Sequence, residues 1–212
     1  MPCPLCETRK PKRQCPALGQ LICAPCCGTY REVTVDCPET CPHLIASRRH
    51  DRADATADPG WQPIAPEVRI PERFVATQPA LVAHLSAAIA QHWRSNPTVA
   101  DPDVLACLNS LVQTLTTLRA GIIYETRPMG PLRAGLFDAL QSAWRNFQAL
   151  ERNEMAMQPA RDADFELAIV LLARLAQYES NGRPRSRRAL ARLVSFAPNP
   201  AAPEPANLLV TP

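Results

Sequence analysis

The chain has 212 residues and a formal net charge of +3 at pH 7. This length suits one sizeable domain and a small module, and the charge lacks the strong basic excess of a dedicated nucleic-acid-binding protein. No run of about 18 apolar residues is present, which argues against a membrane-spanning helix. The first residues also lack the apolar stretch of a secretory signal, so we expect a cytoplasmic protein.

Eight of the nine cysteines lie within residues 3–41. Structural disulfides are rare in a reducing compartment, so clustered thiols there favour metal binding. Two Cys-x-x-Cys knuckles, Cys3-Pro4-Leu5-Cys6 and Cys23-Ala24-Pro25-Cys26, each allow two sulfurs to meet one ion across a tight turn. The same stretch has few large apolar residues, and a module this small usually needs a metal or disulfide staple.

The eight thiols suffice for two tetrahedral zinc sites. Cys26 and Cys27 are adjacent and should project in different directions, so we assign them to different ions. The first zinc ion is expected on Cys3, Cys6, Cys23 and Cys26. The second is expected on Cys15, Cys27, Cys37 and Cys41. Such interleaved sets form a cross-brace, and a closed all-thiolate site predicts structural metal without catalysis.

The segments CPALGQLICAPCCGTYR and CPETCPHL carry a resemblance to known zinc fingers. Their spacing resembles the cross-brace or treble-clef fingers of the B-box, MYND and HIT types. It also looks like the N-terminal motif of a family of uncharacterised bacterial proteins in which a similar finger precedes a helical region. The resemblance covers residues 3–43 and implies no activity.

Several alternatives to this assignment stay open. Because the zinc-finger families usually include histidine ligands, His43 could replace one cysteine. Cys26 and Cys27 could exchange roles. The thiols could also hold a single zinc ion or an iron–sulfur cluster, or they could form disulfides.

The rest of the module and the segment that follows it are predicted from local patterns. Residues 31–36 alternate and are rich in β-branched side chains, which predicts a short strand. Residues 44–49 predict a helical turn that closes a zinc-binding module spanning 1–49. Residues 50–73 are polar and contain four prolines, which is typical of a linker. Trp61 and Ile64 are its candidates for docking onto a neighbouring surface.

Helical periodicity dominates residues 74–196. We expect four main amphipathic helices and a short fifth helix. These begin near Pro79, Asp101, Pro131, Asp162 and Ser186. Asp101 is the predicted N-cap, with Pro102 at the first helical position. The expected fold is therefore mainly α, with a zinc-stapled module that contains short β-strands followed by a four- to five-helix bundle. The Pro-rich tail, 197–212, is expected to be disordered.

Two basic clusters are candidates for contact with phosphates or acidic partners. The first is the loop with Arg9, Lys10, Lys12 and Arg13, and the second comprises Arg183, Arg185, Arg187, Arg188 and Arg192. The simpler interpretation is a solvated loop that balances the thiolates and a solvated helix start. Positive charge at a helix N-terminus is unfavourable, however, which hints that the second cluster has another role.

Three other features are expected to be structural. Cys107 lies among apolar residues and should be a buried small side chain. His84 and His92 lack a nearby carboxylate and are not predicted to be catalytic. Tyr124, Glu125 and Arg127 lie in a loop that could form a binding surface, although packing of Tyr124 on the bundle is the simpler expectation.

The sequence has no Gly-rich phosphate loop, nucleophile elbow or His-Glu-x-x-His pattern. The first hypothesis is therefore a non-enzymatic adaptor or regulatory protein that binds an unidentified protein partner and contains structural Zn²⁺. The alternative is a nucleic-acid-binding, transcription-regulatory protein that uses the basic loop of the finger.

Overall fold

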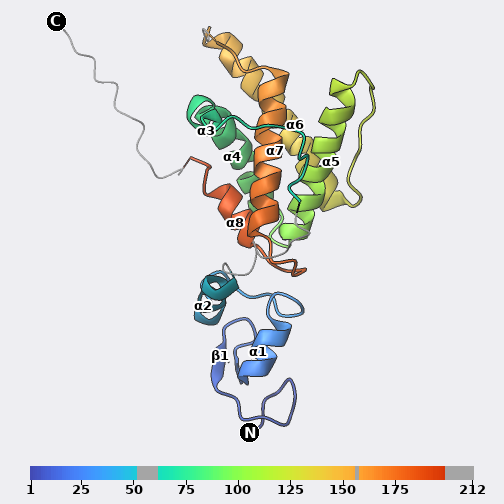
Figure 1. Ribbon diagram of the computed structural model, residues 1–212. Helices are drawn as coiled ribbons and strands as arrows, with labels where there is room; N and C mark the ends of the chain where they lie inside the picture. Colours follow the sequence, from blue (N-terminus) through green and yellow to red (C-terminus); the bar gives the residue numbers. More distant parts are fainter. Residues whose placement is uncertain (52–61, 156–157, 199–212) are drawn as a thin grey trace, which may run out of the picture.

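The computed structural model describes residues 1–51, 62–155 and 158–198. A small N-terminal module lies at one end of a helical bundle (Figure 1). The described residues are mainly helical with one small sheet, which confirms the predicted fold class. No helix among them is long and apolar enough to cross a membrane. Trp61 and most of the Pro-rich tail lie outside the described residues.

The N-terminal part, residues 1–51, is called the cysteine module below. Strand β1 (Arg13–Cys15) pairs antiparallel with β2 (Gln20–Ile22). The turn between them contains Gly19, whose φ of 65° is readily reached without a Cβ. Two helices complete the module, α1 (Ala24–Tyr30) and α2 (Pro42–Asp51). The predicted turn at 44–49 is thus part of a longer helix.

The strand predicted over 31–36 does not form. One carbonyl oxygen, that of Tyr30, accepts three backbone hydrogen bonds, from the N–H groups of Val33, Thr34 and Val35. Glu32 adopts a positive φ of 53°, which no regular strand contains. The segment instead closes a tight loop, and its two ends meet in a single parallel bridge between Arg31 and Val35.

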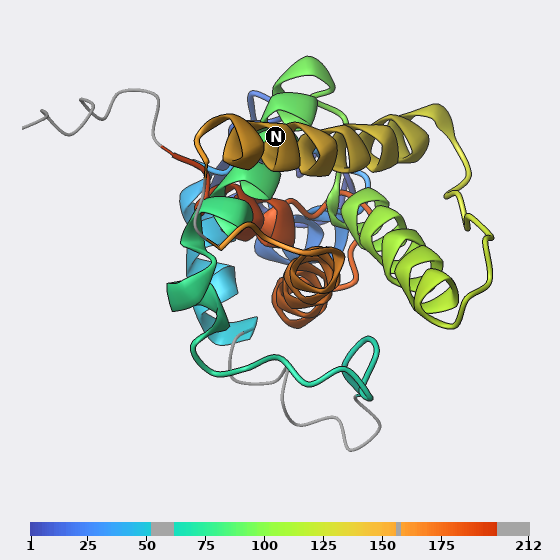
Figure 2. The ribbon, with the colours of Figure 1, turned by 90° about the horizontal axis from the view of Figure 1, so that it is seen from above.

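The bundle contains two short and four long helices. They are α3 (Phe74–Thr77), α4 (Pro79–Ser95), α5 (Asp101–Arg119), α6 (Pro131–Asn153), α7 (Asp162–Glu179) and α8 (Arg188–Val194). Helix α4 packs on α6, and α7 packs on both α5 and α8 (Figure 2). Their apolar faces share one core, with Leu85, Leu108, Phe137 and Ile169 at most 1% exposed.

Asp101 has a different role from the predicted N-cap. The cap position is Ala100, whose N–H donates to the carboxylate of Asp103 at 3.1 Å. Asp101 is fully buried, and its carboxylate accepts the hydroxyl of Ser186 at 2.6 Å and the N–H of Leu190 at 2.9 Å. A buried carboxylate requires such donors, and here they fix the start of α5 to α8.

The described part of the predicted linker is bound to the bundle. The guanidinium of Arg174 on α7 donates to the carbonyl oxygens of Ile64 at 2.9 Å and Val68 at 2.8 Å. The side chain of Ile64 also packs against the core, as predicted. These contacts hold residues 62–68 along α7.

Arginines of the second basic cluster join the bundle to the cysteine module. Arg183 donates to the carbonyl oxygens of Gly28 at 3.1 Å and Arg31 at 2.6 Å. Arg187 forms an ion pair with Asp36, and this hydrogen bond holds the pKa of Asp36 below its usual range. The expectation of a solvated helix start is therefore wrong for these arginines, because tertiary contacts of this kind leave no local sequence signal.

Glu32 lies at the centre of the same junction. Its carboxylate accepts a hydrogen bond from Arg48 on α2 at 3.0 Å and from the amide of Asn181 at 2.9 Å. Its backbone carbonyl accepts the N–H of Arg185 at 2.8 Å. Arg48 also pairs with Glu39. Side chains from the module and from the loop after α7 thus meet at one buried acidic residue.

Replacing Glu32 with alanine should lower the free energy of unfolding by about 3 kcal/mol, because it leaves Arg48 without its buried partner. Glu39→Ala is the matched control. It removes a carboxylate from the same arginine, but the Glu39 side chain is 36% exposed whereas that of Glu32 is 3% exposed. The control should therefore cost less than about 1 kcal/mol. Urea unfolding followed by helical circular dichroism measures both, and equal losses would contradict the proposed role of burial.

Candidate metal centre

Two local structures bring the first four cysteines together. In the first knuckle, the carbonyl oxygen of Cys3 accepts the N–H of Cys6 at 3.3 Å and that of Glu7 at 2.7 Å. In the second, Cys23 is the N-cap of α1, and Pro25 occupies the first turn of that helix, where its missing N–H costs nothing. A tight turn and a helix N-terminus thus present two thiols each.

The four Sγ atoms of Cys3, Cys6, Cys23 and Cys26 lie within 4.8 Å of one another. The distance between the sulfurs of Cys6 and Cys23 is 3.9 Å. A tetrahedral zinc ion with Zn–S bonds of about 2.3 Å separates its sulfurs by about 3.8 Å. Three of the four cysteines are at most 5% exposed. This group is therefore positioned to bind a metal ion, as predicted for the first site.

The surroundings of the first site favour thiolate sulfur at Cys3 and Cys6 and oppose it at Cys26. The backbone N–H of Cys23 donates to the Sγ atom of Cys3 at 3.2 Å, and a hydrogen bond from the Thr8 side chain lowers the pKa of the Cys6 thiol to about 5. Burial and the neighbouring sulfurs raise the pKa of Cys26 to about 12. Four thiolates this close repel one another, and a bound metal cation would offset the repulsion between their negative charges.

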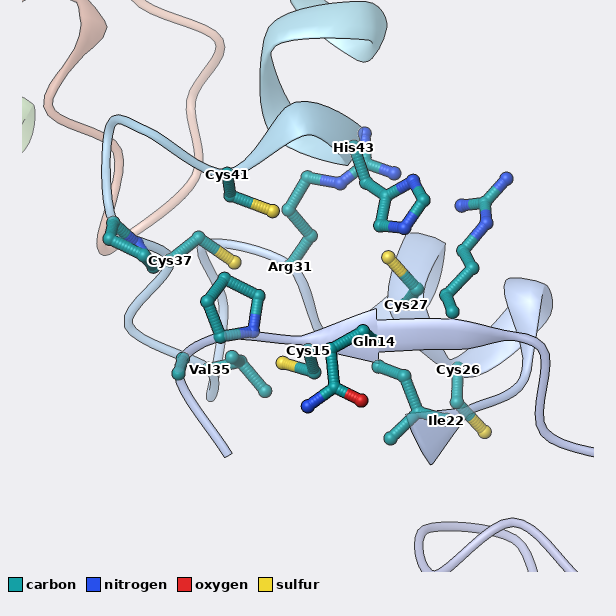
Figure 3. A pocket seen from close by; sticks show the side chains of 14 residues that line it. Gln14, Cys15, Ile22, Cys26, Cys27, Arg31, Val35, Cys37, Cys41 and His43 are labelled. Carbon is teal, nitrogen blue, oxygen red and sulfur yellow. The ribbon is translucent and has the colours of Figure 1, made fainter. Parts of the chain in front are cut away.

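The four cysteines predicted for the second site line a single cavity. It has a volume of about 10 Å³, room for one water-sized particle. Figure 3 shows the sulfurs of Cys15, Cys27, Cys37 and Cys41 directed toward its interior, with the ring of His43 beside Cys27. These donors are spread more widely than the first set, since no other group of three within the described residues lies within 4.8 Å.

A buried arginine that the motif search missed also lines this cavity. Arg31 is 9% exposed, and its Nε–H group has no hydrogen-bond partner among the described residues. A buried donor without an acceptor is costly. A thiolate would accept this hydrogen bond and be stabilised by the positive charge, so the cavity suits anionic sulfur. The position of Arg31, soon after the second knuckle, is the sequence signal that could have identified it.

Helix α1 accounts for the different roles of Cys26 and Cys27. Consecutive residues of an α-helix point about 100° apart. Cys26 faces the first group of thiols, and Cys27 points into the second cavity (Figure 3). His43 lies at the second cavity as well, so any metal ligation by this histidine would take place there and not at the first group of thiols.

None of the nine cysteines forms a disulfide, and all of them lie within the described residues. Cys107 is fully buried in the bundle core, which confirms its predicted structural role.

The predicted basic loop adjoins the thiols, because Arg13 lines the second cavity and the carbonyl oxygen of Arg9 accepts the N–H of Cys3 at 2.9 Å. Arg9, Lys10 and Lys12 are exposed and Arg13 is half-buried, and none of them forms an ion pair within the described ranges. The prediction that Tyr124 packs on the bundle is wrong, because its side chain is 65% exposed.

Comparisons of the chain with protein-family models, with curated proteins and with solved structures find no match. The support for the candidate metal centre is therefore the arrangement of its sulfur atoms.

Cys23→Ser should lower the metal content of the purified protein by one ion per chain, because a hydroxyl is a poor zinc ligand. Elemental analysis of protein prepared with excess zinc and reductant measures the change. Cys107→Ala, which removes a thiol outside the module, should retain the wild-type content. Equal metal content in Cys23→Ser and the wild type would exclude the first group as a metal site.

Proposed function

We propose that the cysteine module binds two structural zinc ions. The observation that carries the proposal is the four-thiol group of Cys3, Cys6, Cys23 and Cys26, whose sulfur spacing fits a tetrahedral ion. Four sulfur ligands in a tetrahedron are typical of zinc or of iron–sulfur sites. With all positions taken by thiolate, the ion has no open position for substrate. Its role is then to hold together a module whose small buried core consists mostly of cysteines.

The second zinc ion is assigned to Cys15, Cys27, Cys37 and Cys41. Two observations support it: the four side chains share one small cavity, and Arg31 offers that cavity an unpaired buried donor. Binding requires the sulfurs to approach one another more closely than they do here. The ion would then connect β1, α1 and the segment before α2, three parts of the module.

Native mass spectrometry under reducing conditions should show two zinc ions on the wild-type chain and one on Cys37→Ser, because a three-thiol remnant holds zinc poorly. One ion on both proteins would contradict the second site. The mass of an iron–sulfur cluster on the wild type would contradict zinc itself.

The second part of the proposal is that the protein is a non-enzymatic adaptor or regulatory protein that docks another protein. An apolar loop between α5 and α6 supports it. Ile122, Ile123, Tyr124 and Met129 are between 57% and 95% exposed. Exposed clusters of large apolar side chains mark interaction sites. The loop runs along the outer side of α5 (Figures 1 and 2), where a partner has free access.

Hydrogen bonds to α5 fix the backbone of this apolar loop. The hydroxyl of Thr114 accepts the N–H of Thr126 at 2.9 Å, and the hydroxyl of Thr117 donates to the carbonyl oxygen of Tyr124 at 3.1 Å. The backbone is thus turned toward the helix while the apolar side chains face outward. A surface ordered in advance reduces the entropy cost of binding, which favours a docking role over a simple connection.

Nucleic-acid binding by the basic loop is the alternative function. Its specific support is that Arg9, Lys10 and Lys12 are exposed and have no carboxylate partner in the described part of the chain. Such side chains are free to contact phosphates. The loop has no exposed aromatic ring for base stacking, so protein docking remains our first proposal.

Ile123→Ser should reduce capture of the native partner from cell extract at least about fivefold, because the side chain is 95% exposed and would be buried on docking. Crosslinking followed by quantitative mass spectrometry measures this capture. Tyr178→Ser, which changes another exposed apolar side chain, is the control and should capture the partner normally.

Two outcomes would contradict docking at this loop. One is equal capture by Ile123→Ser and the wild type. The other is capture that nuclease treatment abolishes and that falls steeply with salt, which would support the nucleic-acid alternative.

A further inference from the structure

A second pocket lies where the cysteine module meets the bundle, between α2 and the end of α7 with α8. Its volume is about 580 Å³, within the range of small-molecule sites. Four arginines line it, two from the module and two from the bundle: Arg48, Arg49, Arg188 and Arg192. One carboxylate, that of Glu179, also lines it. Neither part of the chain forms this pocket alone.

Two of the four arginines are held in place by carboxylates. Arg188 is 8% exposed, and its Nε–H donates to Glu179 at 2.9 Å. Arg48 binds Glu32 at 3.0 Å and also Glu39. A guanidinium has five N–H donors, so each of these arginines is oriented by its partner and retains further donors.

The other two arginines have no carboxylate partner among the described residues. The guanidinium of Arg192 lies over the ring of Phe196, 4.9 Å from its centroid. A guanidinium stacked by its face leaves its N–H edge free for an anion. Arg49 is exposed at the other wall of the pocket. Carboxylates compensate Arg48 and Arg188, so the uncompensated positive charge at the pocket is that of Arg49 and Arg192.

We propose that this pocket binds a small organic molecule that carries a phosphate or diphosphate group. Guanidinium groups pair with phosphate oxygens through two parallel hydrogen bonds. Ile45 and Ala191 supply an apolar wall for the organic part. A concave site of this size suits a small molecule, whereas a nucleic-acid backbone needs a basic groove that continues along several nucleotides.

Calorimetric titration of the full-length, zinc-loaded protein with adenosine diphosphate tests the proposal, and adenosine serves as the uncharged probe. Adenosine diphosphate should bind and adenosine should not. Arg49→Gln and Arg192→Gln should each weaken binding about tenfold or more, because each removes charge-assisted hydrogen bonds. Neither arginine has an ion-pair partner in the described residues, so both variants should retain the wild-type melting temperature.

The charge-matched control is Arg145→Gln, which removes an exposed arginine on α6 and should leave the affinity within about twofold. Three outcomes would overturn the proposal: no binding of adenosine diphosphate, equal weakening by the control variant, or equal binding of adenosine. Tighter binding of a single-stranded RNA oligonucleotide through Arg49 and Arg192 would also overturn it, in favour of a nucleic-acid surface.

Discussion

The structure depends on one buried carboxylate, that of Glu32, which joins the two parts of the chain. Burying an ionised group is costly unless donors surround it. Here the donors come from α2 of the module and from the loop after α7. The residue also adopts a positive φ, a conformation that only a well-determined environment maintains. The module and the bundle are therefore packed against each other through polar contacts and not through a shared apolar core.

The same segment connects the candidate metal centre with the bundle. Residues 28–36 supply the carbonyl oxygens and the carboxylates that the bundle's arginines and Asn181 contact. This segment lies between Cys27 and Cys37, two of the ligands proposed for the second ion. Metal binding in the second cavity would therefore restrict the segment against which the bundle packs. A structural ion bound there would stabilise the interface with the bundle as well as the module.

The predictable parts of this protein were those with a local chemical signal. Helical periodicity located the long helices of the bundle, and the spacing of the two knuckles identified the first group of thiols. The strand predicted at 31–36 failed because the chain forms a tight loop there, and Glu32 in this loop contacts distant partners. Asp101 was misassigned because its carboxylate is satisfied by Ser186 and Leu190, far away in sequence. Such long-range polar contacts have no periodicity, so no window of sequence contains them.

The distribution of the cysteines has a consequence for synthesis of the chain. Proteins emerge from the ribosome with the N-terminus first. The first group of thiols is complete once Cys26 has emerged, whereas Asn181 and Arg183 are added much later. During that interval Glu32 and the carbonyl oxygens of Gly28 and Arg31 lack their partners from the bundle. The order of the chain thus allows the first group of thiols to be complete early, and a metal ion bound there would make the module a preformed surface on which the newly made bundle completes its packing.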